Sequence, residues 1–379
     1  MTITLSIPES LKPEDGRFGS GPSKIRPEQI AALDAGATTL LGTSHRQAPV
    51  KQLVASIREG LREFFHLPEG YEVALGNGGA SAFWEIACAS LITRRAAFGT
   101  YGSFSAKFAS AANAPFLEDP VLFPGEPGTY RLPELTEGVD TYCWAHNETS
   151  TGVAAPIRRV AGSREAGALT VIDGTSAAGA LPVDISQTDV YYFSPQKAFG
   201  ADGGLWVAIL SPEAIDRAAG VESSAHLEGA HRWVPPFLSL TTALNNSRKD
   251  QTLNTPAVAT LIMMENQIRW LNNNGGLAWA TTRCAKSASI LYSWAERSEY
   301  AAPFVVDADA RSNAVVTIDL DERVQASQVL SILRENGIVD AAGYRKLGRN
   351  QLRVGVFPSV EPADVMAFTK CVDYVVEHL

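Results

Sequence analysis

The feature that most constrains the fold is an alternation of short apolar runs with helical stretches between about residues 70 and 210. Three of these runs, at 171–172, 190–193 and 205–210, are bounded by Gly, Asp or Pro, which is typical of buried strands. Strands that alternate with helices pair mostly in parallel, because each helix carries the chain back across the sheet. The sequence therefore predicts an α/β layer with a mostly parallel sheet.

The C-terminal third has a different pattern, typical of a smaller α+β domain joined by long helices. We expect one helix over 257–272, which ends at the Asn/Gly run 272–276, and a second helix that follows this run to about 297. A strand at 314–320, a helix at 327–336, a strand at 351–357 and a last helix from Glu361 should follow. The expected organisation is an N-terminal segment (1–20), a large domain (21–260) and a small C-terminal domain (261–379).

Composition and charge narrow the class of partner. The 379 residues are 45% hydrophobic, which suffices for a sizeable core, and 32 basic against 41 acidic residues give a net charge of −9. That acidity disfavours broad contact with nucleic acid or an anionic membrane. No apolar run reaches the roughly 18 residues of a membrane span, no signal peptide is evident, and the four cysteines have no metal-site spacing. We expect a cytoplasmic protein with a small-molecule ligand and no metal.

Three features of the α/β segment carry chemistry. The glycine-rich turn 76–81 leads into a helix, whose N-terminus can bind an anion such as phosphate, although such turns are equally often purely structural. Asp173 ends a strand, where ligands bind in open α/β sheets, although a turn or helix-cap role is the more common one. Lys197 closely follows the strand 190–193, so burial can lower its pKa and free its amine to form an imine.

Together these features predict pyridoxal phosphate as the cofactor. That cofactor needs an imine-forming lysine, an acid that keeps its pyridine nitrogen protonated, and a phosphate cradle. Lys197 and Asp173 are therefore the candidate catalytic residues, and the conjunction is much stronger than any of its parts.

Five segments of the chain match a known family: 18–23, 42–46, 144–149, 193–197 and 345–353. With these segments the chain resembles the phosphoserine aminotransferases, a group of class V pyridoxal-phosphate enzymes, and in particular the actinobacterial branch. The resemblance implies a fold-type I transferase with a seven-stranded sheet in its large domain. It also implies transamination between O-phospho-L-serine and 2-oxoglutarate in serine biosynthesis, with phosphohydroxythreonine of pyridoxine biosynthesis as a plausible second substrate.

The resemblance also implies roles for the residues near the cofactor. Lys197 would bind the cofactor and move the substrate's α-proton, and Asp173 would pair with the pyridine nitrogen. Phe104 would stack on the ring, at a position where many relatives carry a tryptophan. The remaining expected contacts are Ala80, Ser81 and Gln196 for the phosphate and Thr149, with Thr151 as the alternative, for the ring hydroxyl.

The implied phosphate site is completed by a second subunit. In the family an Asn–Thr pair comes from the neighbouring subunit, and Asn254–Thr255 matches it here. We therefore expect a homodimer with shared active sites.

The substrate carries a phosphate and a carboxylate, so an acidic protein needs a locally basic site for it. The stretch 345–353 holds four basic residues in nine, a local reversal of the overall charge. Arg353 matches the family arginine that binds the substrate α-carboxylate in bidentate fashion. The expected phosphate ligands are His45, Arg46, Arg345 and Lys346, whereas Arg349 reads better as a solvated residue. Many relatives also have an arginine just after the cradle glycines, where this chain has Ala80–Ser81.

Two rival functions stay open at this point. One is another enzyme of the same class, such as an alanine– or serine–glyoxylate aminotransferase, which needs no phosphate pocket. The other is a non-catalytic α/β protein whose turn 76–79 binds a nucleotide.

Overall fold

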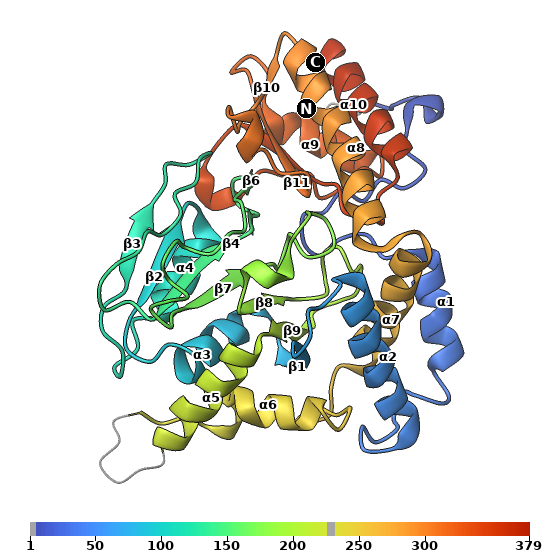
Figure 1. Cartoon of the computed structure of the whole chain (residues 1–379). Coiled ribbons are helices and arrows are strands. Elements are labelled where there is room, and N and C mark those ends of the chain that lie inside the picture. Colours follow the sequence, from blue (N-terminus) through green and yellow to red (C-terminus); the bar gives the residue numbers. More distant parts are fainter. Residues whose placement is uncertain (1–4, 226–231) are drawn as a thin grey trace.

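The computed structural model describes residues 5–225 and 232–379, which form a larger and a smaller unit (Figure 1). The larger unit is built on a seven-stranded sheet. In spatial order its strands are β1 (Glu72–Gly78), β9 (Gly204–Leu210), β8 (Val190–Phe193), β7 (Leu169–Asp173), β4 (Thr141–Ala145), β2 (Ala96–Thr100) and β3 (Val121–Pro124). Only β9 runs antiparallel to its neighbours; the other strands share one direction. The predicted mostly parallel α/β sheet is confirmed.

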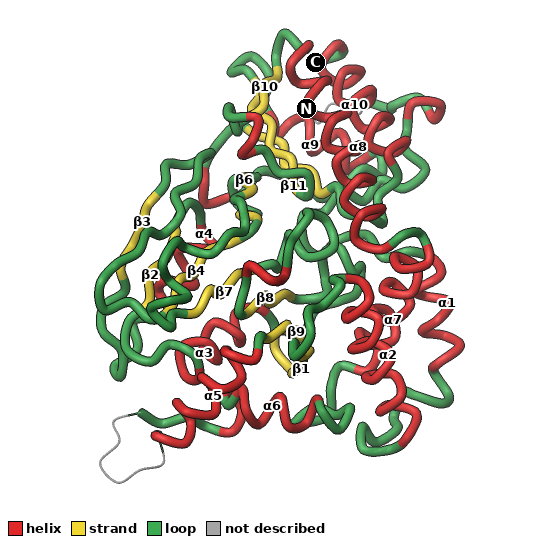
Figure 2. The backbone as a smooth tube through the Cα atoms, viewed as in Figure 1, coloured by secondary structure: helices red, strands yellow, loops and turns green. Residues whose placement is uncertain are grey.

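Helices cover both faces of this sheet, as Figure 2 shows. Along β9 the odd-numbered residues from Leu205 to Ile209 pack into one core, and the even-numbered residues from Trp206 to Leu210 pack into the other. Both sets are apolar because a strand covered on two faces buries every side chain. The helices of the first face are α1 (Pro27–Gly36), α2 (Ala48–Phe64) and α7 (Val258–Asn273). Those of the second are α3 (Ala80–Ser90), α4 (Ser103–Ala111), α5 (Pro212–Ser224) and α6 (Leu240–Ser247).

The smaller unit lies at the top of Figure 1 and has its own core. Its antiparallel sheet has the order β10 (Ala301–Pro303), β11 (Val315–Leu320) and β12 (Gln351–Gly355). Three helices pack on it, α8 (Gly276–Arg297), α9 (Ala326–Glu335) and α10 (Pro362–Glu377). β10 was not expected from the sequence, and the other elements agree with the expected helices and strands of the C-terminal third to within about two residues.

The two cores meet inside the long helix α8. Ala280 still packs in the core of the larger unit, whereas Ala288 packs in that of the smaller one. α7 packs against α2, and Phe18 of the N-terminal segment lies in the smaller core. The division into 1–20, 21–260 and 261–379 stays a prediction. Its boundary after residue 260 falls inside α7.

The carboxyl ends of β1, β7 and β8 lie at the same edge of the sheet, since these strands share one direction. Each is followed by one of the predicted chemical features, so the sheet gathers residues far apart in sequence. A hairpin of β5 (Asn147–Glu148) and β6 (Val153–Ala154) follows β4 beside this edge. None of the helices in the described residues is long and apolar enough to cross a membrane.

Candidate active site

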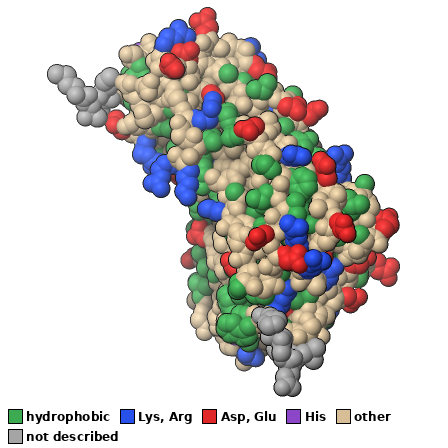
Figure 3. All heavy atoms as spheres, turned by 90° about the vertical axis from the view of Figure 1, so that its left-hand side faces the viewer, with side chains coloured by type: hydrophobic (Ala, Val, Ile, Leu, Met, Phe, Trp, Pro, Cys, Tyr) green, Lys and Arg blue, Asp and Glu red, His purple; other side chains and the backbone are tan. Residues whose placement is uncertain are grey.

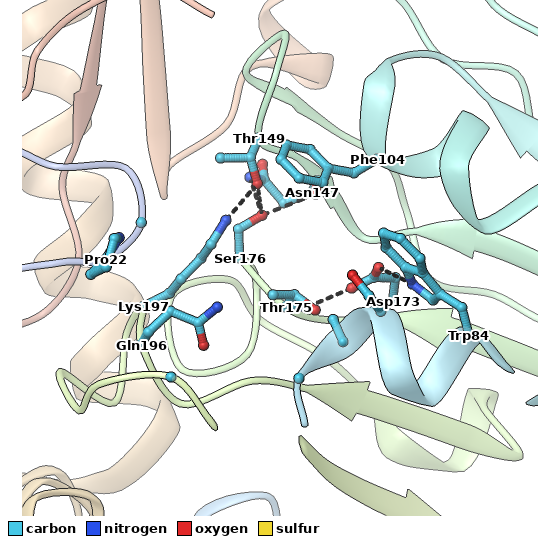
Figure 4. A pocket seen from close by; sticks show the side chains of 15 residues that line it. Pro22, Trp84, Phe104, Asn147, Thr149, Asp173, Thr175, Ser176, Gln196 and Lys197 are labelled. Carbon is cyan, nitrogen blue, oxygen red and sulfur yellow. Dashed lines mark hydrogen bonds between the residues drawn. The ribbon is translucent and has the colours of Figure 1, made fainter. Parts of the chain in front are cut away.

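A cavity of about 360 Å³ opens at this sheet edge (Figure 4). Its size lies in the range of small-ligand pockets, roughly 300 to 1,000 Å³. The residues that line it come from the N-terminal loop, the start of α3 and α4, the β5 hairpin and the loops after β7 and β8. They are Gly21, Pro22, Gly79, Ala80, Ser81, Trp84, Phe104, Asn147, Thr149, Asp173, Thr175, Ser176, Gln196, Lys197 and Gly203.

Lys197 reaches this cavity from the loop after β8, with 7% of its surface exposed. Its Nζ donates a hydrogen bond of 2.9 Å to Thr149 Oγ1. Burial lowers the pKa of the Lys197 amine to about 8; the charge of Arg353 lowers it as well, while Asp173 and Glu148 act in the opposite direction. A useful fraction of the amine is therefore neutral, and so nucleophilic, near neutral pH.

Asp173 ends β7 and is held by two donors. The backbone N–H of Thr175 donates to Oδ1 at 2.9 Å, and the indole Nε1 of Trp84 donates to Oδ2 at 3.3 Å. Figure 4 shows the Trp84 ring turned toward this carboxylate. Asp173 is thus a fixed carboxylate on the cavity wall, suited to hold a protonated ring nitrogen.

The first turn of α3 faces the cavity with Ala80 and Ser81. The N–H groups of a helix's first turn have no partner inside the helix, and the helix dipole makes this end positive. Gln196, from the loop that carries Lys197, lies on the same cavity. This end of the cavity can bind a phosphate group.

The β5 hairpin supplies a chain of hydrogen bonds next to the lysine. Thr149 Oγ1 donates to Ser176 Oγ at 2.8 Å, and Asn147 Nδ2 also donates to Ser176 Oγ, at 2.9 Å. Thr151 is buried but lies outside the lining residues, and its carbonyl accepts a bond from Thr317. Of the two threonines considered from sequence, Thr149 is the one that the fold places in the cavity.

Three buried polar atoms on lining residues have no hydrogen-bond partner among the described residues: Gln196 Oε1, Asn147 Oδ1 and Thr175 Oγ1. Buried polar groups in proteins are nearly always paired, so such atoms indicate a polar ligand. The Phe104 ring, whose centroid lies 5.5 Å from Lys197 Nζ, adds an apolar wall. The cavity therefore fits a flat ring that carries polar groups and a phosphate.

The comparison with family models agrees with this geometry. The model of the aminotransferase class-V family matches residues 18–347, which is most of the chain. The chain belongs to the class-V aminotransferases.

Individual proteins similar to this chain include enzymes with different substrates. A phosphoserine aminotransferase of Rhodococcus opacus (strain B4) is 56% identical over 380 residues, covering 100% of both chains. A crystal structure of a phosphoserine aminotransferase from Cytophaga hutchinsonii is 21% identical, with a TM-score of 0.84 over 95% of this chain and 99% of that one. An alanine–glyoxylate aminotransferase from Nostoc sp. is 20% identical, with a TM-score of 0.78 over 98% and 96%. The fold is thus shared by aminotransferases with different substrates.

The residues of this class-V aminotransferase that were expected to bind substrate lie outside the cavity lining. Arg353 approaches it most closely, because its Nη1 donates to the Thr149 carbonyl at 3.1 Å. Arg46, Arg345 and Lys346 are exposed. Arg349, which reads as a solvated residue, pairs with Asp319.

His45, Asn254 and Thr255 are also absent from the residues that line the cavity of their own chain. Thr255 Oγ1 lies 3.3 Å from His45 Nδ1, and the Thr255 carbonyl accepts a 2.9 Å bond from Asn77 Nδ2. Burial, and secondly the charge of Arg46, lowers the pKa of His45. His45 and Thr255 thus contact one another beside the glycine-rich turn, and neither bonds to Lys197.

The sequence interpretation missed Trp84, Asn147, Thr175 and Ser176 as lining residues. Trp84 follows Ala80 by four residues in α3, so a helical spacing from the cradle placed it on the cavity side. Thr175 and Ser176 follow Asp173 in the same turn. A search of each motif's immediate neighbours would have found all four.

Proposed function

We propose that this protein is a phosphoserine aminotransferase that uses pyridoxal phosphate. The observation that carries the proposal is the 56% identity, over the full length of both chains, to a relative with that name. The arrangement of Lys197, Asp173 and the start of α3 around one cavity supports it. The reaction moves an amino group reversibly between phosphoserine and 2-oxoglutarate, giving 3-phosphohydroxypyruvate and glutamate.

The cavity residues have separable tasks in this reaction. Bound pyridoxal phosphate supplies an electrophilic carbon and a ring that accepts negative charge from the substrate's α-carbon. The Lys197 amine would hold the cofactor and would carry the proton to and from the substrate's α-carbon. Asp173 would keep the ring nitrogen protonated, and Ala80, Ser81 and Gln196 would hold the phosphate.

Two further cavity residues position the ring. The Thr149 hydroxyl is placed between Lys197 Nζ and Ser176 Oγ, so it can bond the ring hydroxyl side. Phe104, whose ring centroid lies 5.5 Å from Lys197 Nζ, would cover one face of the cofactor ring and help to exclude water from the reacting atoms.

Substrate binding requires the basic residues that the sequence singled out. Arg353 lies beside the Thr149 backbone and would take the α-carboxylate. Arg46, Arg345 and Lys346, with His45, would take the substrate phosphate. On the face shown in Figure 3, acidic and basic side chains lie intermixed, so local clusters rather than a broad basic surface would select this substrate.

The contact between His45 and Thr255 has a consequence for assembly. Both residues lie outside the cavity of their own chain and touch one another, so they would enter a neighbouring subunit's site together. The proposal therefore includes a homodimer in which each site takes His45, Arg46, Asn254 and Thr255 from the partner. A cytoplasmic location and phosphohydroxythreonine as a second substrate are also part of the proposal.

All four cysteines, Cys88, Cys143, Cys284 and Cys371, are buried. Burial raises the pKa of Cys88 to about 12, the opposite of what a nucleophilic thiol needs. This speaks against a reaction that proceeds through a cysteine.

The half-reaction tests the proposal directly. Purified protein loaded with pyridoxal phosphate should show a visible absorption band that borohydride bleaches, with the label on Lys197. Added phosphoserine should remove the band much faster than alanine does at equal concentration. A protein without the band would support the nucleotide-binding alternative, and a faster reaction with alanine would support the glyoxylate-dependent one.

A further inference from the structure

The middle residue of the segment Asn147–Glu148–Thr149 has no part in the reaction described so far. Asn147 and Thr149 line the cavity, whereas Glu148 does not. Its exposed fraction is 0%, so its carboxylate is withdrawn from water altogether. A buried carboxylate is costly unless donors surround it, so its partners show what it does.

Those partners are concentrated at the start of α4. Glu148 Oε2 accepts bonds from the backbone N–H groups of Phe104 at 3.1 Å and Ser105 at 2.9 Å. It also accepts from Ser105 Oγ at 2.9 Å. Glu148 Oε1 accepts from Ser150, through the backbone N–H at 3.1 Å and the hydroxyl at 2.6 Å. The carboxylate thus caps α4, where the helix dipole also favours a negative charge.

The packing around this cap leaves little freedom. A Cβ at position 102 would lie 2.2 Å from Glu148 Cγ, so the glycine there is what lets the carboxylate reach the helix. Ser150 Oγ in turn accepts a 3.0 Å bond from the backbone N–H of Ser103. The first three residues of α4 are therefore fastened to the hairpin that carries Thr149.

Phe104 is one of these three residues. Its ring lies on the cavity with its centroid 5.5 Å from Lys197 Nζ, and Lys197 bonds Thr149. Glu148 therefore links two groups that lie beside the reactive amine, the Phe104 ring and the Thr149 hydroxyl, which Figure 4 shows next to one another.

We propose that Glu148 is a positioning residue that acts through Phe104: it fixes the first turn of α4 so that the Phe104 ring lies against the cofactor. This rests on the proposed function, because it assumes that pyridoxal phosphate occupies the cavity. A cap that served stability alone would make α4 firmer without changing how the cavity binds its cofactor.

A matched variant separates these two roles. Glu222 is also buried, and its carboxylate accepts bonds from Ser90 Oγ, Ser239 Oγ and Thr241 N near the start of α6, away from the cavity. Glu148→Gln and Glu222→Gln should both lower the melting temperature of the apoprotein. Only Glu148→Gln should raise the dissociation constant for pyridoxal phosphate, by roughly threefold to tenfold, the worth of one aromatic contact. Equilibrium titration of apoprotein with the cofactor measures this without any turnover.

Two further variants complete the test. In a Phe104→Leu background, Glu148→Gln should weaken cofactor binding by less than about twofold, because the ring through which it acts is gone. If Glu148→Gln folds poorly, Ser150→Ala takes its place. It keeps the charge of Glu148, removes one of the donors to it, and should weaken cofactor binding by a smaller factor. An equal effect of Glu148→Gln with and without Phe104, or equal cofactor affinity of the Glu148 and Glu222 variants, would overturn the positioning role. A wild-type chain that binds no pyridoxal phosphate would instead overturn the proposed function.

Discussion

Replacing Lys197 by methionine should make the protein without cofactor more stable near neutral pH. Burial lowers the pKa of the Lys197 amine from 10.5 to about 8. Below about pH 8 the amine is protonated in both the folded and the unfolded chain, so the folded state holds a charge that its surroundings disfavour. Methionine fills similar space without that charge.

The magnitude follows from linkage between protonation and folding. A lowering of about 2.5 pKa units corresponds to roughly 3 kcal/mol of lost stability when the amine is protonated. The variant also loses the hydrogen bond from Nζ to Thr149 Oγ1, worth about 1 kcal/mol. The expected net gain for Lys197→Met is therefore roughly 2 kcal/mol at about pH 7.

The effect of Lys197 on the free energy of unfolding should change with pH in a defined direction. Between about pH 8 and pH 10.5 the unfolded chain binds more protons than the folded one, so wild-type stability contributed by Lys197 rises with pH. At about pH 10 the wild type and the variant should be nearly equal. Urea unfolding of both apoproteins at the two pH values measures the difference.

Lys370, an exposed residue of α10, provides the control. Lys370→Met removes the same charge from a solvated site and should change stability by less than about 0.5 kcal/mol at either pH. If Lys197→Met is no more stable than the wild type at neutral pH, or if its advantage persists unchanged at high pH, the reasoning about a desolvated amine is refuted.

Three further predictions concern catalysis. Trp84→Phe keeps an aromatic ring but removes the indole N–H that donates to Asp173, so kcat should fall several-fold with a smaller change in cofactor affinity. Steady-state kinetics and cofactor titration measure the two effects, and an unchanged kcat would contradict this role of Trp84. Arg46→Ala should raise KM for phosphoserine far more than for glutamate, since only phosphoserine carries a phosphate, and equal effects on both would remove that assignment. Mixed Lys197→Ala and Thr255→Ala proteins should regain activity if sites are shared between subunits, whereas none should return, despite confirmed subunit exchange, if each site belongs to one chain.

The residues around the reactive amine were largely predictable from local sequence. Asp173 and Lys197 each follow an apolar strand, and parallel strands bring their carboxyl ends to one edge whatever the details of packing. The helical spacing from Ala80 could have placed Trp84 on the cavity side, but its contact with Asp173 depends on how α3 packs beside β7, which no local pattern encodes. Thr149 could not be told from Thr151 because both lie in a turn, where no periodicity fixes the direction of a side chain.

The basic residues show a second limit of prediction from sequence, which concerns where distant residues meet. From sequence, Arg353 and Arg46 belong to one substrate pocket, yet only Arg353 reaches the hairpin beside Lys197. His45 and Thr255 pair with one another instead. Residue types and spacing alone do not tell which subunit's site a residue serves; for Asn254–Thr255 that expectation came from the family resemblance. Glu148 was overlooked because its importance lies in a cap on a helix distant in sequence.

The central claim is that the site selects an amino acid that bears a phosphate, and a direct comparison of substrates tests it. The values of kcat/KM would be measured for phosphoserine, serine and alanine, each with 2-oxoglutarate and with glyoxylate as the amino acceptor. We expect kcat/KM for phosphoserine with 2-oxoglutarate to exceed that of every other pair by at least about 100-fold, because the other substrates would leave the basic groups of a phosphate site unpaired. A preference for alanine or serine with glyoxylate would contradict it.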